Sequence, residues 1–214
     1  MKLDNKELML YLVTDRKWLK EDSLELVVEK AIKNGVSFIQ LREKDLSTDE
    51  FRSLALKLKE VTDKYHIPFL INDNIEVAVE IKTDGVHIGQ DDMDAKEARE
   101  LIGVEKILGV SASTIEEAKK AEEDGADYIG VGAIFPTASK DDAGAVSIET
   151  LKAINKAVNI PVVAIGGINA SNIEDFKGSG IDGVAVISAI LEKEDIAGAT
   201  RELRKLADKT LGGN

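Results

Sequence analysis

The chain has 214 residues, of which 43% are hydrophobic and 32% charged, a composition typical of a globular domain with a large core. Its 28 basic and 40 acidic residues give a net charge of −12, which argues against a broad basic face for nucleic acid. The sequence has no cysteine and two histidines, so disulfides, thiolate catalysis and cysteine-ligated metals are excluded, and a bound metal should be a hard cation such as magnesium.

Eight short apolar runs, often with β-branched residues, recur along the chain and are typical of buried strands. They cover residues 8–14, 37–42, 68–73, 85–89, 106–111, 127–135, 161–167 and 182–188. The stretches between them carry helix signals. Residues 23–35, for example, place Leu24, Val27, Val28 and Ala31 on one face before the stop signal Gly35.

Three serine–glutamate pairs have the spacing of a capping box, in which a serine caps the helix and the glutamate three residues later reaches back. The pairs are Ser47 with Glu50, Ser113 with Glu116, and Ser171 with Glu174. They predict where three of the helices begin.

Eight strand–helix units in 214 residues predict a single domain of residues 1–214, an α/β fold that forms a (β/α)8 TIM barrel. A doubly wound open sheet is the alternative, and the count of eight favours closure because it leaves no strand over. In both architectures functional residues collect beyond the C-terminal ends of the strands, so these ends indicate the site.

The second run ends in a cluster of charges. Alternation places Gln40, Arg42 and Lys44 on one side of an extended chain, with Leu41 and Glu43 on the other. Arginine and lysine together suit phosphate oxygens. The alternative is a solvated turn before the Ser47 cap.

Aspartates follow the third and fourth runs. Asn72 and Asp73 end the third run, and Asp91, Asp92 and Asp94 follow the fourth. Each has an alternative role as a helix cap, which suits Asp94 best. Two carboxylates from adjacent strands can instead hold one Mg²⁺, which keeps several waters and is completed by substrate phosphates.

The last four runs end in small and hydroxyl residues. Ser111 is a candidate substrate contact after the fifth run, and the sixth leads into a loop with Thr137, Ser139 and Lys140, which the alternative reading leaves solvated. The seventh and eighth runs suggest a phosphate cradle, since glycine backbone N–H groups and a helix N-terminus favour an anion. The cradle residues are Gly166, Gly167, Ile187 and Ser188.

Together these ends predict two anion sites on one rim, and hence two phosphorylated substrates or one with widely separated phosphates. His87, inside the fourth run, is interpreted as a packed or hydrogen-bonded core residue rather than a base. With no evident general base, a reaction assisted by charge on a leaving group fits better than proton abstraction.

The ordered set of strand ends resembles the thiamine-phosphate synthase family between Tyr11 and Ile190. The motifs are "YLVTD", "QLREKD", "IND", "GVHIGQDD", "GVSAST", "DYIGVGAIFPTASK", "VVAIGGI" and "GVAVISAI". The resemblance implies a Mg²⁺-dependent transferase of thiamine biosynthesis. It would join 4-amino-2-methyl-5-(diphosphooxymethyl)pyrimidine to 4-methyl-5-(2-phosphoethyl)thiazole, or its carboxylated form, through a pyrimidine carbocation, releasing diphosphate.

The resemblance also implies roles for individual residues. The pyrimidine diphosphate would be held by Gln40, Leu41, Arg42, Glu43, Lys44, Asn72, Ser111 and Lys140, of which Arg42, Lys44, Ser111 and Lys140 would be catalytic. Mg²⁺ would be ligated by Asp73 and Asp92. The thiazole phosphate would be held by Thr137, Ala138, Ser139, Gly167, Ile187 and Ser188. Ser139 stands where the family usually has threonine, and the hydroxyl is retained.

Three alternatives remain open at this point. A thiazole tautomerase of the same barrel family would not need the diphosphate and Mg²⁺ residues. A Schiff-base aldolase needs a lysine inside the barrel, and residues 128–135 contain none. A noncatalytic phosphate-binding regulator is the third.

The sequence also bears on location and partners. No apolar run approaches the roughly 18 residues of a membrane helix, and residues 1–10 do not have the layout of a signal peptide. We therefore expect a cytoplasmic protein with small-molecule substrates and neither a nucleic-acid nor a membrane partner. Whether the chain forms a homo-oligomer is left open.

Overall fold

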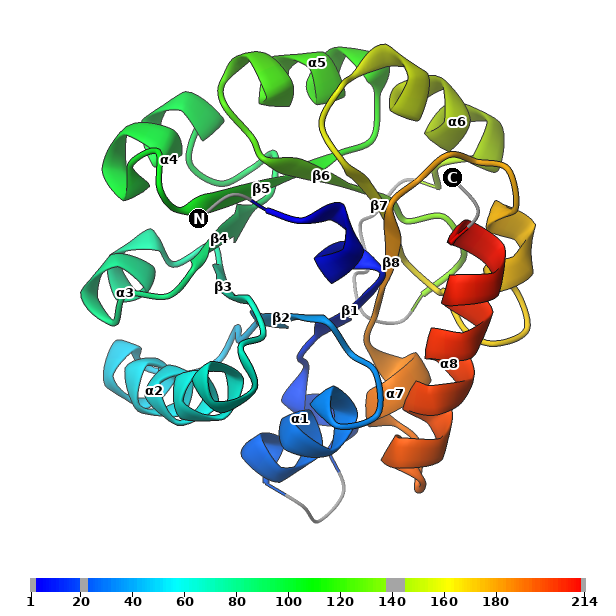
Figure 1. Cartoon of the computed structure of the whole chain (residues 1–214). Helices are drawn as coiled ribbons and strands as arrows, with labels where there is room; N and C mark the ends of the chain where they lie inside the picture. Colours follow the sequence, from blue (N-terminus) through cyan, green and yellow to red (C-terminus); the bar gives the residue numbers. More distant parts are fainter. Residues whose placement is uncertain (1–2, 20–22, 138–144, 213–214) are drawn as a thin grey trace.

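Eight parallel strands close into a barrel in which each strand pairs with the next along the chain and β8 pairs with β1 (Figure 1). The computed structural model describes residues 3–19, 23–137 and 145–212. The strands are β1 (Leu10–Val13), β2 (Phe38–Leu41), β3 (Phe69–Asn72), β4 (Gly85–Ile88), β5 (Ile107–Ala112), β6 (Tyr128–Val131), β7 (Val162–Ile165) and β8 (Gly183–Val186). Seven lie within the apolar runs and β5 extends one residue beyond its run, to Ala112, so the predicted barrel is confirmed and the open sheet is wrong.

Helices surround the barrel and connect its strands (Figure 1). The α-helices are α1 (Leu24–Ile32), α2 (Thr48–Tyr65), α3 (Ile75–Glu80), α4 (Ala95–Ile102), α5 (Ile115–Glu123), α6 (Ile148–Ala157), α7 (Ser188–Leu191) and α8 (Ile196–Leu211). The described residues also form the 3₁₀ helices η1 (Asn5–Leu8), η2 (Arg16–Trp18) and η3 (Ile173–Phe176).

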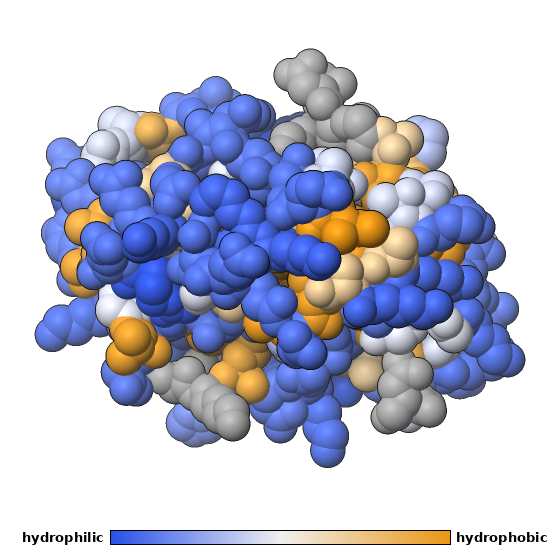
Figure 2. Space-filling model, turned by 90° about the horizontal axis from the view of Figure 1, so that it is seen from above, coloured by the Kyte–Doolittle hydropathy of each residue, from blue (hydrophilic) through white to orange (hydrophobic). Residues whose placement is uncertain are grey.

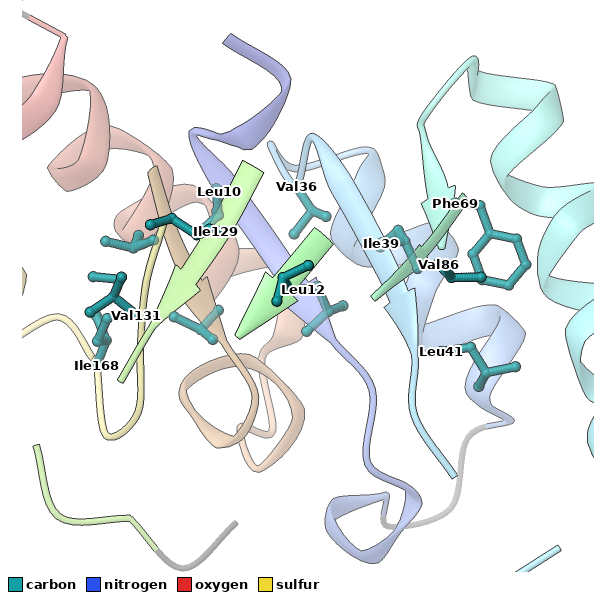
Figure 3. Close-up of a cluster of buried hydrophobic side chains, with 14 of the residues drawn as sticks. Leu10, Leu12, Val36, Ile39, Leu41, Phe69, Val86, Ile129, Val131 and Ile168 are labelled. Atoms are coloured by element: carbon teal, nitrogen blue, oxygen red, sulfur yellow. The ribbon is translucent and has the colours of Figure 1, made fainter. Parts of the chain in front are cut away.

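Side chains alternate between two apolar layers along each strand, as the two-residue period requires. In β1, Leu10 and Leu12 join the larger cluster between strands and helices, while Tyr11 and Val13 join a smaller cluster inside the barrel. Part of the outer cluster is drawn in Figure 3. A strand that feeds both layers is apolar along its whole length, which explains the continuous runs in the sequence.

The same kind of hydrogen bond, from a backbone N–H to a side chain, recurs at the N-terminal end of the barrel. The residue before each even-numbered strand accepts a hydrogen bond from a backbone N–H near the start of the preceding strand. The bonds join Leu10 N to Ser37 Oγ (3.2 Å), Phe69 N to Asp84 (2.9 Å), Leu108 N to Asp127 (2.8 Å) and Val162 N to Asp182 (2.9 Å). These bonds satisfy donors at the barrel end opposite to the one where the site is expected.

One of the three predicted capping boxes is confirmed. Ser47 caps α2, and the Glu50 carboxylate accepts a hydrogen bond from the Ser47 backbone N–H. The box at Ser113 is wrong, since Thr114 caps α5 one residue later. The box at Ser171 is also wrong, because this side chain donates to Asn169 within a loop.

Arg99 of α4 joins the loop between α4 and β5 to the loop between α5 and β6. Its guanidinium donates to the backbone carbonyls of Gly103, Lys106 and Gly125 and to the Asp127 carboxylate, at 2.5–3.1 Å. The planar, forked guanidinium can reach these acceptors together, which a lysine ammonium cannot.

We expect Arg99→Lys to lower the free energy of unfolding by about 2–3 kcal/mol, because it leaves partly buried carbonyls without donors. Urea unfolding followed by circular dichroism would measure the loss. Arg52→Lys is the matched control, since Arg52 pairs with the exposed carboxylates of Asp49 and Glu80, and this variant should lose much less stability. Equal losses in the two variants would contradict the role given to Arg99.

Most of the surface drawn in Figure 2 is hydrophilic, and apolar residues interrupt it in separate patches. The large apolar side chains that are exposed are Leu26, Leu56, Val79, Leu101 and Val104. Among the helices that the structure describes, none is both long and apolar enough to span a bilayer.

Candidate active site

A cavity of about 160 Å³ opens where the strands end at their carboxyl side. Every strand contributes to it. Its polar side chains are Tyr11, Gln40, Arg42, Asn72, His87, Ser111, Tyr128, Thr137 and Ser188, and its walls include Val13, Val163, Ile165, Ala185 and Ile187. The combination of apolar walls and a few polar groups is typical of a small-molecule site.

The second strand delivers Gln40 and Arg42 to this cavity, and Thr14 fixes them. The Thr14 N–H donates to the Gln40 carbonyl (2.9 Å), and the Thr14 hydroxyl accepts from the Arg42 N–H (3.1 Å). Thr14 is fully buried, so these bonds hold the backbone at the strand end. The Arg42 side chain thereby faces the cavity as the alternation predicts.

The other residues of this segment lie elsewhere. Lys44 is exposed and does not line the cavity, because β2 ends at Leu41 and the alternation does not continue beyond Arg42. The Leu41 side chain is fully buried in the outer core, away from the cavity. Glu43 pairs with Arg16 (2.8 Å), and burial raises the pKa of its carboxyl. The Leu41 side chain therefore points away from the cavity, and the contact of this residue with a substrate stays a prediction.

Asp73 and Asp92 face each other beside Arg42. Burial, and then the neighbouring Asp92 carboxylate, raise the pKa of Asp73 to about 7, while Arg42 acts in the opposite direction. Asp92 is held by the Gly89 N–H, which donates to its carboxylate (2.7 Å). Two carboxylates brought together against their mutual repulsion fit a hard cation, which would relieve that repulsion.

The neighbouring aspartates are placed differently. Asp94 caps α4 and pairs with Lys120 (3.1 Å), and Asp91 is exposed. Within the described ranges, no group of three or more His, Cys, Asp or Glu side chains is arranged to hold a metal. A cation at Asp73 and Asp92 would therefore complete its shell with water or substrate oxygens.

The floor of the cavity is a chain of hydrogen-bonded polar side chains across the barrel. Gln40 Nε2 donates to the Tyr11 hydroxyl (2.5 Å), which lies 2.9 Å from the Tyr128 hydroxyl. The Tyr128 hydroxyl lies 2.9 Å from His87 Nδ1, and His87 Nε2 lies 3.0 Å from Ser111 Oγ. His87 is thus a hydrogen-bonded interior residue, as interpreted from the sequence.

Glycines on two neighbouring strands make room for this chain. A Cβ on Gly109 would stand 2.3 Å from the Tyr128 ring, and one on Gly130 would stand 3.2 Å from the His87 ring. The rings of Tyr11 and Tyr128 pack edge to face with each other and with Phe38, with ring centroids 4.6–6.1 Å apart. The chain is therefore enclosed by close packing.

The glycines of the predicted phosphate cradle follow β7, across the barrel from β3 and its neighbouring carboxylates. Gly166 and Gly167 have φ values of +100° and +65°. The Gly166 carbonyl accepts from the Phe135 N–H (3.0 Å), and the Gly167 carbonyl accepts from the side chains of Asn169 (3.1 Å) and Asn172 (3.0 Å). This region thus connects the end of β7 to the loop after β6.

The structure brings most of the predicted contacts to one cavity. Those that line it are Gln40, Arg42, Asn72, Ser111, Thr137, Gly167, Ile187 and Ser188. Ala138, Ser139 and Lys140 lie outside the described residues. Sequence reasoning missed Tyr11 and Tyr128, although alternation within "LYLV" and "YIGV" would have placed both inside the barrel.

Comparisons with known proteins match nearly the whole chain to one family. Residues 10–190 match the family described as thiamine monophosphate synthase. Thiamine-phosphate synthase of Clostridium tetani (strain Massachusetts / E88) is 56% identical over 199 residues, 93% of this chain and 95% of that protein. The structure of thiamine phosphate pyrophosphorylase from Pyrococcus furiosus superposes with a TM-score of 0.89 at 40% identity, covering 97% of this chain and 99% of that one.

Proposed function

We infer the chemistry of the cavity from one premise: the chain belongs to the thiamine monophosphate synthase family, and it is a transferase that forms thiamine phosphate. We propose that its substrates are the pyrimidine diphosphate and the thiazole phosphate named above. The observation that carries this proposal is the position of Arg42, Asp73 and Asp92 beside a cavity with apolar walls. Such a site can hold an aromatic ring inside and a diphosphate at its edge.

Mg²⁺ fits the residues at this edge. Asp73 and Asp92 would hold it, and it would neutralise part of the charge that develops on the departing diphosphate. Arg42 adds a fixed cation whose planar guanidinium suits phosphate oxygens. Lys44, Lys140 and the backbone at Leu41 and Glu43 complete the proposed diphosphate site as expectations from the family resemblance.

The proposed reaction needs no general base from the protein. The bond between the pyrimidine CH₂ and the diphosphate oxygen breaks, and its electron pair leaves with the diphosphate. The thiazole nitrogen then donates its lone pair to the CH₂ carbon, so the new C–N bond forms without loss of a proton. Gln40, Asn72 and Ser111 would orient the pyrimidine, while Thr137, Ala138, Ser139, Gly167, Ile187 and Ser188 would hold the thiazole phosphate.

Specific features disfavour the alternatives. A thiazole tautomerase has no use for a carboxylate pair beside Arg42. A Schiff-base aldolase needs a lysine in the cavity, and among the described residues that line it there is none. A noncatalytic regulator would share the cavity, so turnover must decide against it.

The test is an assay of the purified chain with both phosphorylated substrates and Mg²⁺. We expect thiamine phosphate and diphosphate in equal amounts, with formation abolished by a chelator and restored by excess Mg²⁺, because the charge on the leaving group needs compensation. Binding of both substrates without product would support the regulator instead. Product formation that resists a chelator would remove the metal from the proposal.

A further inference from the structure

We propose that Tyr11, Tyr128 and His87 are positioning residues that couple Gln40 to Ser111 through a chain of hydrogen bonds. Recognition of one hydrogen-bonding group of the pyrimidine at Gln40 then depends on recognition of a complementary group at Ser111. The inference rests on the proposed function, in which Gln40 and Ser111 contact the pyrimidine. It concerns three side chains that have no direct part in the chemistry described above.

The chain of bonds is buried from Gln40 to His87 and ends at the half-buried Ser111. Tyr128 is fully buried, Tyr11 is 2% exposed and Gln40 4% exposed. A buried hydroxyl that fails to donate costs about 1–3 kcal/mol, so each hydroxyl should pass its proton to the next member. The direction of one bond therefore determines the direction of all the others.

With the Gln40 amide nitrogen donating to Tyr11, only one arrangement satisfies every member. Tyr11 donates to Tyr128, Tyr128 donates to His87 Nδ1, and the proton on His87 Nε2 is donated to Ser111 Oγ. The Ser111 hydroxyl proton is then available to the cavity. At the other end, the side-chain carbonyl oxygen of Gln40 is available to the cavity as a hydrogen-bond acceptor.

Turning the Gln40 amide over reverses every bond. Ser111 then donates to His87, the ring donates to Tyr128, Tyr128 donates to Tyr11, and Tyr11 donates to the Gln40 carbonyl oxygen. The cavity now meets an acceptor at Ser111 and the amide N–H₂ of Gln40 as a donor. In each arrangement the Ser111 hydroxyl and the Gln40 amide group that is not bonded to Tyr11 take opposite roles, one as donor and the other as acceptor.

This rule suits an aminopyrimidine. Its exocyclic amino group donates and its ring nitrogens accept, so one edge offers both kinds of partner. A contact at Gln40 fixes the direction of the chain and so prepares Ser111 for its own contact. Loss of either contact should therefore weaken the other, which independent contacts would not show.

The test is a double-mutant cycle on the whole enzyme. The kcat/KM for the pyrimidine diphosphate is measured for the unmodified chain, Gln40→Ala, Ser111→Ala and the double variant. If the two contacts were independent, the fold-change in kcat/KM of the double variant would equal the product of the two single fold-changes. We expect it to differ from that product roughly tenfold, which is the size of coupling found within one bonded network. In a Tyr128→Phe background, which keeps the ring and removes the link, the departure should fall to within about twofold.

Two further variants separate coupling from general damage. Tyr11→Phe breaks the same chain at another link and should abolish the coupling as Tyr128→Phe does, which also covers the case where one variant folds poorly. Tyr65→Phe is the matched control, since its hydroxyl bonds Glu29 on the exterior (2.7 Å), and it should keep the full coupling. The KM for the thiazole phosphate should stay within about twofold in all three, which a general loss of structure would not allow.

The outcomes are distinct. Additive effects of Gln40→Ala and Ser111→Ala in the otherwise unmodified enzyme would overturn the inference, as would coupling that survives in both Tyr11→Phe and Tyr128→Phe. In either case the enzyme still makes thiamine phosphate and the proposed function stands. Absence of product from the unmodified chain would overturn the proposed function and this inference with it.

Discussion

Asp92→Asn is expected to lower kcat/KM at a fixed, subsaturating Mg²⁺ concentration by at least about 100-fold, because it removes one of the two charged ligands proposed for the metal. The asparagine retains an oxygen that can accept from the Gly89 N–H, the bond that Asp92 makes in the structure. The variant therefore removes charge while leaving the loop bond in place. Initial rates measured over a Mg²⁺ titration would show the change as a higher half-saturating concentration.

Asp94→Asn is the matched control two residues away. The Asp94 side chain accepts from the Lys96 N–H at the start of α4, and bonding to Lys120 lowers its pKa. Asparagine is an equally good N-cap, so stability and Mg²⁺ dependence should hardly change. Equal Mg²⁺ requirements in the two variants would mean that Asp92 is a cap or loop residue and not a ligand.

Much of the fold could be predicted because its signals are local. Each strand buries both faces and is therefore apolar along its length in the sequence. Eight such runs are the number that a (β/α)8 barrel requires. Helix starts were less predictable. Ser113 and Thr114 can both cap a helix, and the choice between them depends on which backbone N–H turns toward which hydroxyl.

The rim of the site was predictable in position but less so in detail. Alternation placed Arg42 in the cavity, and it failed at Lys44 because the strand ends at Leu41. The end of a strand is decided by its neighbours in the barrel, which two-residue alternation does not report. The pairing of Asp73 with Asp92 could be predicted because both follow adjacent strands.

The hydrogen-bonded floor was not predictable from local patterns. Tyr11 and Tyr128 lie 117 positions apart and meet because β1 and β6 send side chains into the same interior layer. That contact depends on barrel closure, on strand register and on the absence of a side chain at Gly109. Alternation could have indicated that both tyrosines point inward, but not which partner each would find.

Gly167→Ala is expected to raise the KM for the thiazole phosphate at least 30-fold, on the order of 2 kcal/mol of lost binding. A Cβ at this position would stand 2.6 Å from the Pro136 carbonyl oxygen and 2.8 Å from the Phe135 Cβ. Relief of that contact must move the backbone that leads to Thr137, which lines the cavity. Steady-state kinetics with the thiazole phosphate varied would measure the change.

Gly178→Ala is the control variant, because it has the same backbone strain as Gly167→Ala without the steric contact. Gly178 has φ +68°, close to the +65° of Gly167, yet a Cβ there would meet nothing within 4 Å. Both variants should therefore lose about 1 kcal/mol of stability to the strain of a left-handed alanine, and Gly167→Ala should lose more because of its steric contact. Only Gly167→Ala should weaken thiazole phosphate binding. If both variants keep the original KM, the backbone at Gly167 does not shape the phosphate site, and the cradle must be sought elsewhere on the rim.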